Sequence, residues 1–253
     1  MLIDSHCHLD QLADPGAALA EAGRAGVERI VAVSEGAETM PAVLALKEQY
    51  ADKVLAGLGL HPAWVTRAAV EEVEAGLAFI EEHLAEADVL GEAGLDFKWA
   101  AGDEQQAYQR DILARQFELA ERYGKPVNLH SRRAQRQTME QAIDYRRRTG
   151  FNAQLHWFTQ SKKLVRVCND EGLYVSVGPT AIADPQTQTV ALEIDRELLL
   201  LETDAPVPIG GVAGHPARAA EVAAKLGELM GLSGAEVAAL TAANAERYLG
   251  ARP

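Results

Sequence analysis

The sequence of 253 residues contains only two cysteines, Cys7 and Cys168, and no long apolar run. Two cysteines do not suggest a disulfide framework, so a reducing cytoplasm is the expected compartment. No stretch approaches the roughly 20 apolar residues that a membrane-spanning helix needs. The first residues also lack the basic and then apolar pattern of a secretory signal. These absences favour a cytoplasmic protein that does not act at a membrane.

Basic residues are also scarce, since 24 lysines and arginines face 37 acidic residues and give a formal net charge of −13. Proteins that hold nucleic acid through its phosphates usually show a basic footprint. Either the substrate is not a polyanion, or bound cations and a local basic patch neutralise it. The sequence has one dense group of basic residues, which we expect to lie on a solvated helix face. The group contains Arg132, Arg133, Arg136, Arg146, Arg147 and Arg148.

Short apolar runs alternate with longer amphipathic segments along the chain. The expected strands are 2–8, 30–34, 54–60, 89–97, 126–131, 152–158, 173–178 and 198–204. The expected helices are 15–25, 39–49, 69–87, 104–123, 134–148, 161–171, 186–194, 216–230 and 233–249, with Thr39 and Ser161 as N-caps and Gly124 as a helix end. Eight strand–helix alternations predict an α/β fold, a (β/α)8 TIM barrel forming a single domain over residues 1–253. A doubly wound sheet is less favoured, because no Gly-x-Gly-x-x-Gly follows the first strand.

Histidines and acidic residues gather at the carboxyl ends of these expected strands. His6 and His8 end the first strand on the same face, because side chains alternate with period two. The other strand ends supply His61, Glu92, Asp96, His130, His156 and Asp204. Active sites of such barrels are built at this end from several strands. Only His83 and His215 fall outside the set, so we expect a site here rather than scattered histidines.

A second polar layer is expected one step below these strand ends. Asp4, Asn128, Gln154 and Glu202 each lie two residues before a member of the set, and therefore on the same face. Buried polar groups must be hydrogen-bonded, so we expect them to orient the candidate ligands. Cys7 should face the opposite way as a packed thiol.

The residue types at the strand ends suit a metal-dependent hydrolase. Four histidines with Glu92 and Asp204 can hold two divalent ions, and Glu92 could bridge them. Two ions neutralise an anionic substrate, lower the pKa of a bound water and stabilise the leaving oxygen. Histidine and carboxylate ligands accept zinc or manganese, and magnesium more weakly. An acidic chain could act on phosphodiesters in this way.

At these residues the sequence resembles the TatD family of metal-dependent deoxyribonucleases, within the amidohydrolase superfamily of barrels. Seven motifs in one order carry the resemblance over essentially the whole chain: 4–9, 59–62, 91–97, 129–132, 156–159, 202–206 and 244–248. The resemblance implies a cytoplasmic DNase that trims 3′ ends with a metal-activated water. Its implied partner is DNA, as single strands or 3′ ends, and we expect the protein to be a monomer.

The resemblance also implies the roles of individual residues. One ion would be held by His6, His8, Glu92 and Asp204, and the other by Glu92, His130 and His156. Asp204 would act as general base on the attacking water, and His61 as donor or proton relay beside the substrate phosphate. Asp96 and Arg132 would position the substrate or the ligands, and exposed Trp64 and Trp99 could stack on bases.

Three departures from the family pattern lie in expected loops. Residues 207–218 are Gly-rich and neutral until Arg218, Arg133 stands where an acidic residue is common, and Trp99 adds a bulky aromatic. Loops shape substrate choice, so an alternative remains a hydrolase of the same superfamily acting on a C–N or ester bond, such as a small cyclic amide or an aminoacyl ester. A non-enzymatic role would require a broken site, and every expected ligand is present.

Overall fold

The computed structural model describes residues 1–250, which fall into two compact units. Unit 1 comprises residues 1–32, 52–54 and 156–248, and unit 2 comprises residues 33–51, 55–155 and 249–250. None of the helices in this described part is both long enough and apolar enough to cross a bilayer.

Unit 1 contains the first strands and the last third of the chain. Its elements are β1 (Leu2–Cys7), η1 (Leu9–Gln11), α1 (Pro15–Arg24), β2 (Val27–Val33, of which Val33 falls in unit 2), α7 (Lys162–Glu171), β7 (Tyr174–Val177), η2 (Pro179–Ile182), α8 (Pro185–Glu193), η3 (Arg196–Leu198), β8 (Leu199–Leu201), η4 (Pro216–Arg218), α9 (Ala219–Met230) and α10 (Gly234–Leu249). β1 pairs in parallel with β2, and β7 with β8. β1 also lies beside the chain that leaves β8, where the Asp204 N–H donates to the His6 carbonyl at 3.0 Å.

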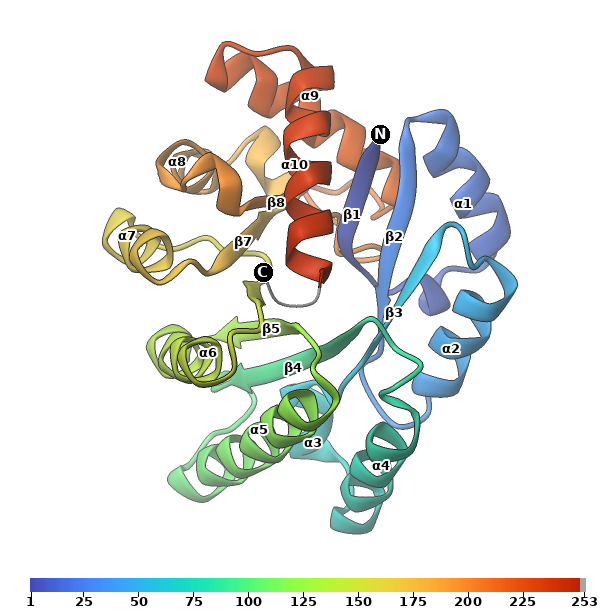
Figure 1. The fold of residues 1–253 in the computed structure, drawn as a ribbon, viewed down its shortest axis with the longest axis vertical. Coiled ribbons are helices and arrows are strands. Elements are labelled where there is room, and N and C mark those ends of the chain that lie inside the picture. The colour runs from blue at the N-terminus through green and yellow to red at the C-terminus, as the bar shows by residue number, and fades with distance from the viewer. Residues whose placement is uncertain (251–253) are drawn as a thin grey trace. The chain divides into compact units, whose positions relative to one another are not determined.

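Unit 2 holds the middle of the chain. Its elements are α2 (Met40–Gln49), β3 (Val54–Leu58, of which Val54 falls in unit 1), α3 (Pro62–Arg67), α4 (Val70–His83), β4 (Val89–Asp96), α5 (Asp103–Tyr123), β5 (Val127–Arg132), α6 (Gln135–Thr149) and β6 (Ala153–Leu155). The pairs β3–β4, β4–β5 and β5–β6 are all parallel. Helices α4, α5 and α6 lie outside β4 and β5 (Figure 1).

The eight strands follow one another in sequence order, β1 to β8, in a single sheet. This order, with a helical segment after each strand, confirms the predicted (β/α)8 fold class. The strand cores are apolar and buried, as in β2 with Ile30 and Val31, and β7 with Val175 and Val177. Strands covered by helices must bury apolar side chains, which explains the near-continuous apolar runs of the sequence. The extent of the domain stays a prediction.

Most predicted element ends agree with the structure to within a few residues, with four informative differences. Strand β8 ends at Leu201, three residues before the predicted end at Asp204. The sequence reading missed the short helix α3, and α4 ends at His83 rather than Ala87. Thr39 and Ser161 occupy the predicted N-cap positions, but neither side chain makes a cap hydrogen bond. Thr39 Oγ1 instead accepts from the Glu35 and Gly36 N–H groups.

Gly124 ends α5 as predicted. It has a left-handed backbone with φ +64°, which a glycine adopts without the steric cost that a Cβ imposes. Its N–H donates to carbonyls of the last helical turn. Cys7 is also confirmed as a packed thiol, since it is fully buried and its Sγ lies 3.6 Å from the Ala205 carbonyl.

Candidate metal centre

Unit 1 brings two histidines of β1 onto one carboxylate from the end of β8. His6 Nε2 and His8 Nε2 each lie 3.4 Å from Asp204 Oδ1. The alternation of a strand places His6 and His8 on one face, and their rings meet edge to face. All three side chains are buried. The predicted clustering of His6, His8 and Asp204 is therefore present within this unit.

The environment of Asp204 keeps its carboxyl group ionised. Burial alone raises the pKa of this carboxyl, but the hydrogen bonds with His6 and His8 outweigh that effect and hold the pKa well below its usual range. The residue has a left-handed backbone with φ 52°, which aspartate tolerates better than most residues. Its N–H is bonded to the His6 carbonyl, so the side chain is aimed by backbone contacts with β1.

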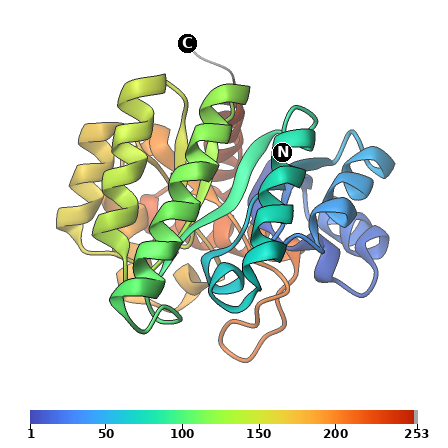
Figure 2. The ribbon, with the colours of Figure 1, turned by 90° about the horizontal axis from the view of Figure 1, so that it is seen from below.

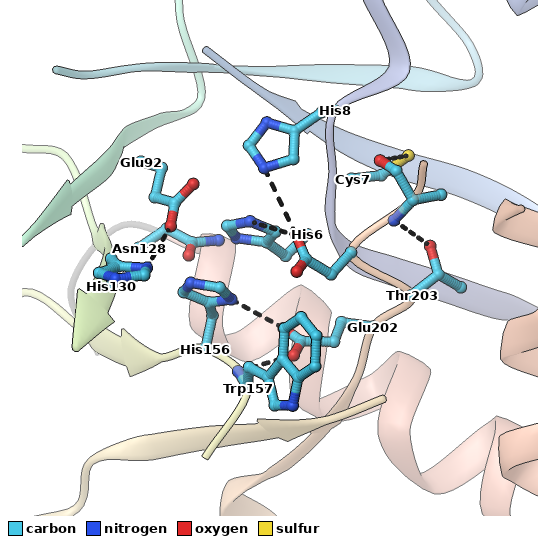
Figure 3. A network of polar contacts seen from close by, with 12 residues as sticks. His6, Cys7, His8, Glu92, Asn128, His130, His156, Trp157, Glu202 and Thr203 are labelled. Carbon is cyan, nitrogen blue, oxygen red and sulfur yellow. Dashed lines mark hydrogen bonds and ion pairs between the residues drawn. The ribbon is translucent and has the colours of Figure 1, made fainter. Parts of the chain in front are cut away.

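His156 and Glu202 extend the cluster of unit 1 (Figure 3). The His156 ring stacks on the His6 ring at a centroid distance of 3.8 Å, and its Nδ1 lies 3.7 Å from Glu202 Oε2. His6, His156 and Glu202 offer ligand atoms close enough together to hold one metal ion. Glu202 accepts from Ser176 Oγ and from the Trp157 N–H, both at 2.6 Å. Glu202 thus lies nearer to the ligands than the sequence indicated.

Asp4 supports this cluster from below. It is fully buried, and its carboxylate accepts from the His6 N–H, the Thr203 N–H and the Thr203 hydroxyl. Burial raises its pKa to about 7, against the lowering effect of those hydrogen bonds. These bonds tie the ends of β1 and β8 together. The predicted role of Asp4, to orient the chain that carries the ligands, agrees with these contacts.

Unit 2 contains a second cluster around Glu92, at the middle of β4. Glu92 Oε1 lies 2.9 Å from His130 Nδ1 and 3.6 Å from His61 Nε2 (Figure 3 draws the first contact). These three residues form another group with metal-ligating spacing. Gly94 pairs with His130 across β4 and β5, and its φ is +151°. A Cβ at Gly94 would lie 2.1 Å from the His130 carbonyl oxygen, so glycine permits this close pairing.

His130 is bonded through both ring nitrogens. Nδ1 contacts Glu92, and Nε2 lies 3.2 Å from Asp96 Oδ2. Burial alone lowers the pKa of His130, but the hydrogen bonds to Asp96 and Glu92 more than offset it and raise the pKa to about 9. Asp96 also accepts from the Lys98 N–H at 2.9 Å. Asp96 therefore positions His130 in addition to closing a turn.

His61 is oriented by its own helix. Its Nδ1 accepts from the Ala63 N–H at 3.0 Å, which makes it the N-cap of α3. A neutral imidazole that accepts at Nδ1 carries its proton at Nε2. The Nε2–H then lies on the side of Glu92, with Nε2 3.6 Å from Glu92 Oε1. This tautomer suits the predicted donor role of His61 better than a ligand role.

The predicted polar layer is buried. Asp4, Asn128, Gln154 and Glu202 are all fully buried, and Asn128 Nδ2 donates to Gln154 Oε1 at 3.3 Å. The register Asn128–Gln154 in the β5–β6 pair places these amides side by side. The predicted burial of these four polar side chains is therefore confirmed.

The donor spacing in the clusters agrees with metal binding. Two ligands that bind one zinc ion tetrahedrally at about 2.1 Å lie about 3.4 Å apart. The His6–Asp204 and His8–Asp204 distances of 3.4 Å match this spacing. The His130–Glu92 distance of 2.9 Å is a hydrogen-bond distance instead. Histidine nitrogens with carboxylates form a donor set typical of zinc or manganese.

The residues that are predicted to contact the substrate differ in their exposure and in their neighbours. Trp99 is 45% exposed, with Lys98 and Arg67 cations 5.4 and 5.6 Å from its ring centroid. Trp64 is only partly exposed, and its indole N–H donates to Glu38 at 3.1 Å. Arg132 is exposed at the end of β5. Trp99 is thus more exposed than Trp64, and the substrate-binding roles of Trp99, Trp64 and Arg132 stay predictions.

His130 should make the metal-free protein less stable as the pH rises from 6.5 through about 9. A histidine whose folded pKa is raised stabilises the fold fully below its unfolded pKa, and this stabilisation is lost as the pH passes the folded pKa. The full effect is roughly 3 kcal/mol in the free energy of unfolding. Denaturant unfolding in a chelator should show the decline, and His130→Gln should flatten it. A wild-type profile as flat as that of the variant would contradict the ion pairing.

Comparison with known proteins gives one consistent result. The sequence profile of a family described as "TatD related DNase" matches residues 3–250. The chain is 31% identical to the human protein named deoxyribonuclease TATDN3, over 96% of this chain and 93% of that one. It is 36% identical to YjjV of Escherichia coli K12, a metal-dependent hydrolase, over 90% of this chain and 89% of the relative. The crystal structure of YjjV superposes with a TM-score of 0.85 at 32% identity, covering 98% and 97% of the two chains.

Proposed function

Because the chain belongs to the family of TatD-related DNases and is a metal-dependent hydrolase, we propose that it hydrolyses DNA phosphodiesters with a metal-activated water, as a 3′–5′ exonuclease. The observation that carries the proposal is the buried histidine–carboxylate cluster at the carboxyl ends of β1 and β8, with donor spacing of 3.4 Å. Such clusters are costly to bury unless a cation or protons compensate them.

The proposed cofactors are two divalent ions, magnesium, manganese or zinc. His6, His8 and Asp204 suit one ion, and Glu92 with His130 suits another, with His156 as a further ligand. The sharing of Glu92 between the ions follows from the family resemblance. When bound, the ions would lower the pKa of a water and neutralise charge on the phosphate.

The side chains around the ions would handle protons and charge. Asp204, ionised at neutral pH, is proposed to accept a proton from the attacking water. The His61 Nε2–H is proposed to donate to a phosphate oxygen or to the departing oxygen. Asp96 would hold the ring of His130 in place through Nε2.

The proposed substrate is single-stranded DNA or a 3′ end. We also propose that the protein works as a cytoplasmic monomer. Trp99 and its two cationic neighbours suit an exposed base and its phosphates, because aromatic rings and arginine stack on bases while lysine meets the backbone. Asp96, Arg132 and Trp64 are proposed to contribute to substrate positioning.

A 5′-labelled single-stranded oligodeoxynucleotide tests the proposal. Metal-stripped protein would be resupplied with magnesium, manganese or zinc in turn, and the products separated by length. A ladder that shortens from the 3′ end supports the exonuclease and ranks the metals. Absence of cleavage with every metal would favour the alternative, a hydrolase of a C–N or ester bond, and cyclic amides and aminoacyl esters would then be assayed.

His61→Ala should lower the turnover rate about 100-fold while leaving the metal content unchanged, because general acid–base groups contribute about 10²–10⁴-fold. The His61 Nδ1 accepts a hydrogen bond, so the neutral ring carries its proton at Nε2, which leaves no lone pair for an ion. Metal content by mass spectrometry and kcat on the same oligonucleotide measure the two effects separately. Loss of metal in His61→Ala would show that His61 is a ligand.

A further inference from the structure

The loop that follows β8 ends in a tight hairpin. Ile209 and Val212 exchange both backbone hydrogen bonds, at 3.0 and 3.1 Å, around Gly210 and Gly211. The two glycines have φ +63° and +78°, and a two-residue turn with two positive φ angles requires such residues. Figure 2 shows the chain here in orange as an extended loop. The Gly-rich stretch singled out in the sequence therefore forms a defined structure.

This hairpin forms one wall of a cavity within unit 1. The cavity has a volume of about 520 Å³ and is lined by Thr180, Ile182, Asp184, Ile209, Val212 and Arg218, among others. Its size falls in the range of small-ligand pockets, roughly 300–1,000 Å³. No residue proposed to hold an ion or to contact the DNA lines this cavity.

The two chain segments that form the walls of the cavity both begin beside the candidate metal-binding cluster of unit 1. The cavity wall formed by η2 follows Gly178. A Cβ at Gly178 would lie 3.4 Å from Glu202. The hairpin wall follows Asp204, whose carbonyl accepts from the Val207 N–H at 2.9 Å. At Gly214 the loop packs back against Pro206 and Val207. A Cβ at Gly214 would lie 2.5 Å from the Val207 carbonyl oxygen. The cavity thus lies on chain segments fixed to Glu202 and Asp204.

Arg218 is the only cation in the lining of this cavity. The residue is 8% exposed, and its Nη1 is buried without a hydrogen-bond partner among residues 1–250. Its Nε contacts Glu221 at 3.2 Å, but the Glu221 side chain is 56% exposed. A buried guanidinium N–H without a partner costs about 1–3 kcal/mol. An anionic group in the cavity would pair with the one positive charge of its lining, and the planar fork of arginine matches phosphate.

The other residues that line the cavity limit which kind of ligand can carry the anionic group. Most of it is apolar, including Pro179, Ile182, Ile209 and Val212. The one carboxylate, Asp184, accepts from the Thr187 N–H and hydroxyl, which hold its pKa below its usual value. An ionised carboxylate opposes a second anionic group but accepts N–H or O–H donors. The lining suits a ligand with one anionic end, an apolar flat body and a few donors.

We propose that this cavity binds a nucleoside monophosphate unit, with the phosphate on Arg218 and the base against the apolar wall of Ile182, Ile209 and Val212. The choice of a nucleotide among singly anionic small ligands rests on the proposed DNA hydrolysis. The same unit is present as a free mononucleotide and as the phosphorylated end of a strand. Arg218 becomes a binding residue that holds the released mononucleotide or a 5′-phosphorylated strand end beside Asp204.

Calorimetric titration of the full chain in a chelator tests the proposal without any turnover. Thymidine 5′-monophosphate should bind saturably, and thymidine and inorganic phosphate should each bind at least about tenfold more weakly. A 5′-phosphorylated oligonucleotide that displaces the mononucleotide would assign the cavity to a strand end. Failure of the strand to displace it would assign the cavity to the free mononucleotide.

Three variants make the test specific. Arg218→Gln should weaken mononucleotide binding at least about tenfold, while Arg166→Gln on the exposed face of α7 should not change it. Val212→Glu at the exposed hairpin tip adds a charge that repels phosphate and should also weaken binding, without touching the core. Equal binding by wild type and Val212→Glu, or phosphate binding as tight as nucleotide binding, would overturn the proposal even if Arg218→Gln fails to fold. A protein that binds the nucleotide but cleaves no DNA would refute the proposed function alone.

Discussion

Glu92→Ala should reduce DNA hydrolysis by about 10³-fold or more and should lower the metal content of the purified protein. Glu92 is buried and faces both His130 and His61. Removing its carboxylate leaves His130 with one acidic partner, Asp96, and removes the anionic oxygen that an ion would share. Even indirect partners of metal ligands affect metal affinity about 10–100-fold, so the loss of a direct ligand should have a larger effect.

The matched control is Glu74→Ala, which removes a carboxylate from the exposed ion pair with Arg115 on the same unit. Exposed pairs contribute about 0–1 kcal/mol, so this variant should keep its activity and metal. Metal content by mass spectrometry and kcat with each resupplied metal are the measurements. If Glu92→Ala keeps more than a tenth of the wild-type rate, the two-ion proposal fails.

Asp204→Asn should lower kcat by about 10³-fold with little change in the fold. Asparagine has nearly the same shape as aspartate and also adopts the left-handed backbone that Asp204 has at φ 52°. The substitution therefore removes the charge and the proton acceptor while it keeps the geometry. General-base groups contribute about 10²–10⁴-fold, and loss of charge at a ligand adds to this.

Two measurements separate the roles of Asp204 as base and as ligand. If it acts mainly as a base, Asp204→Asn should retain metal with a strongly reduced kcat. If it acts mainly as a ligand, the metal content should fall together with kcat, and excess metal should rescue part of the rate. Asp195→Asn, on an exposed residue before η3, provides the control for a lost charge. A wild-type rate in Asp204→Asn would exclude both roles.

The sequence predicts the frame of the site well because strands impose a simple rule. Period two places His6 with His8 and Asn128 with His130, and the structure places each of these residues where that rule requires. The carboxyl ends of parallel strands then meet at one edge. Local pattern and tertiary position agree here, because a residue's face depends only on its place along the strand.

Other features of the site depend on contacts that no local pattern contains. Asp204 and Trp157 have φ angles of 52° and 43°, unusual for residues with a side chain, and lie three and two residues after the ends of β8 and β6. The Trp157 N–H donates to Glu202, so the local backbone is fixed by a residue 45 positions away. Glu202 was expected to lie a layer below the ligands, and this turn brings it to His156. The two-residue hairpin at Gly210–Gly211 was likewise seen only as a Gly-rich stretch.

The environment of the two thiols makes the protein well suited to selective chemical labelling. Burial raises the pKa of Cys168 to about 12 and that of Cys7 well above its ordinary value, and both side chains are fully buried. Thiolates are the reactive species, so neither thiol should react with a maleimide in the folded protein. A cysteine introduced at the exposed Val212 would therefore be the single reactive site on the chain. A fluorophore attached there would report in real time when the hairpin tip meets a ligand.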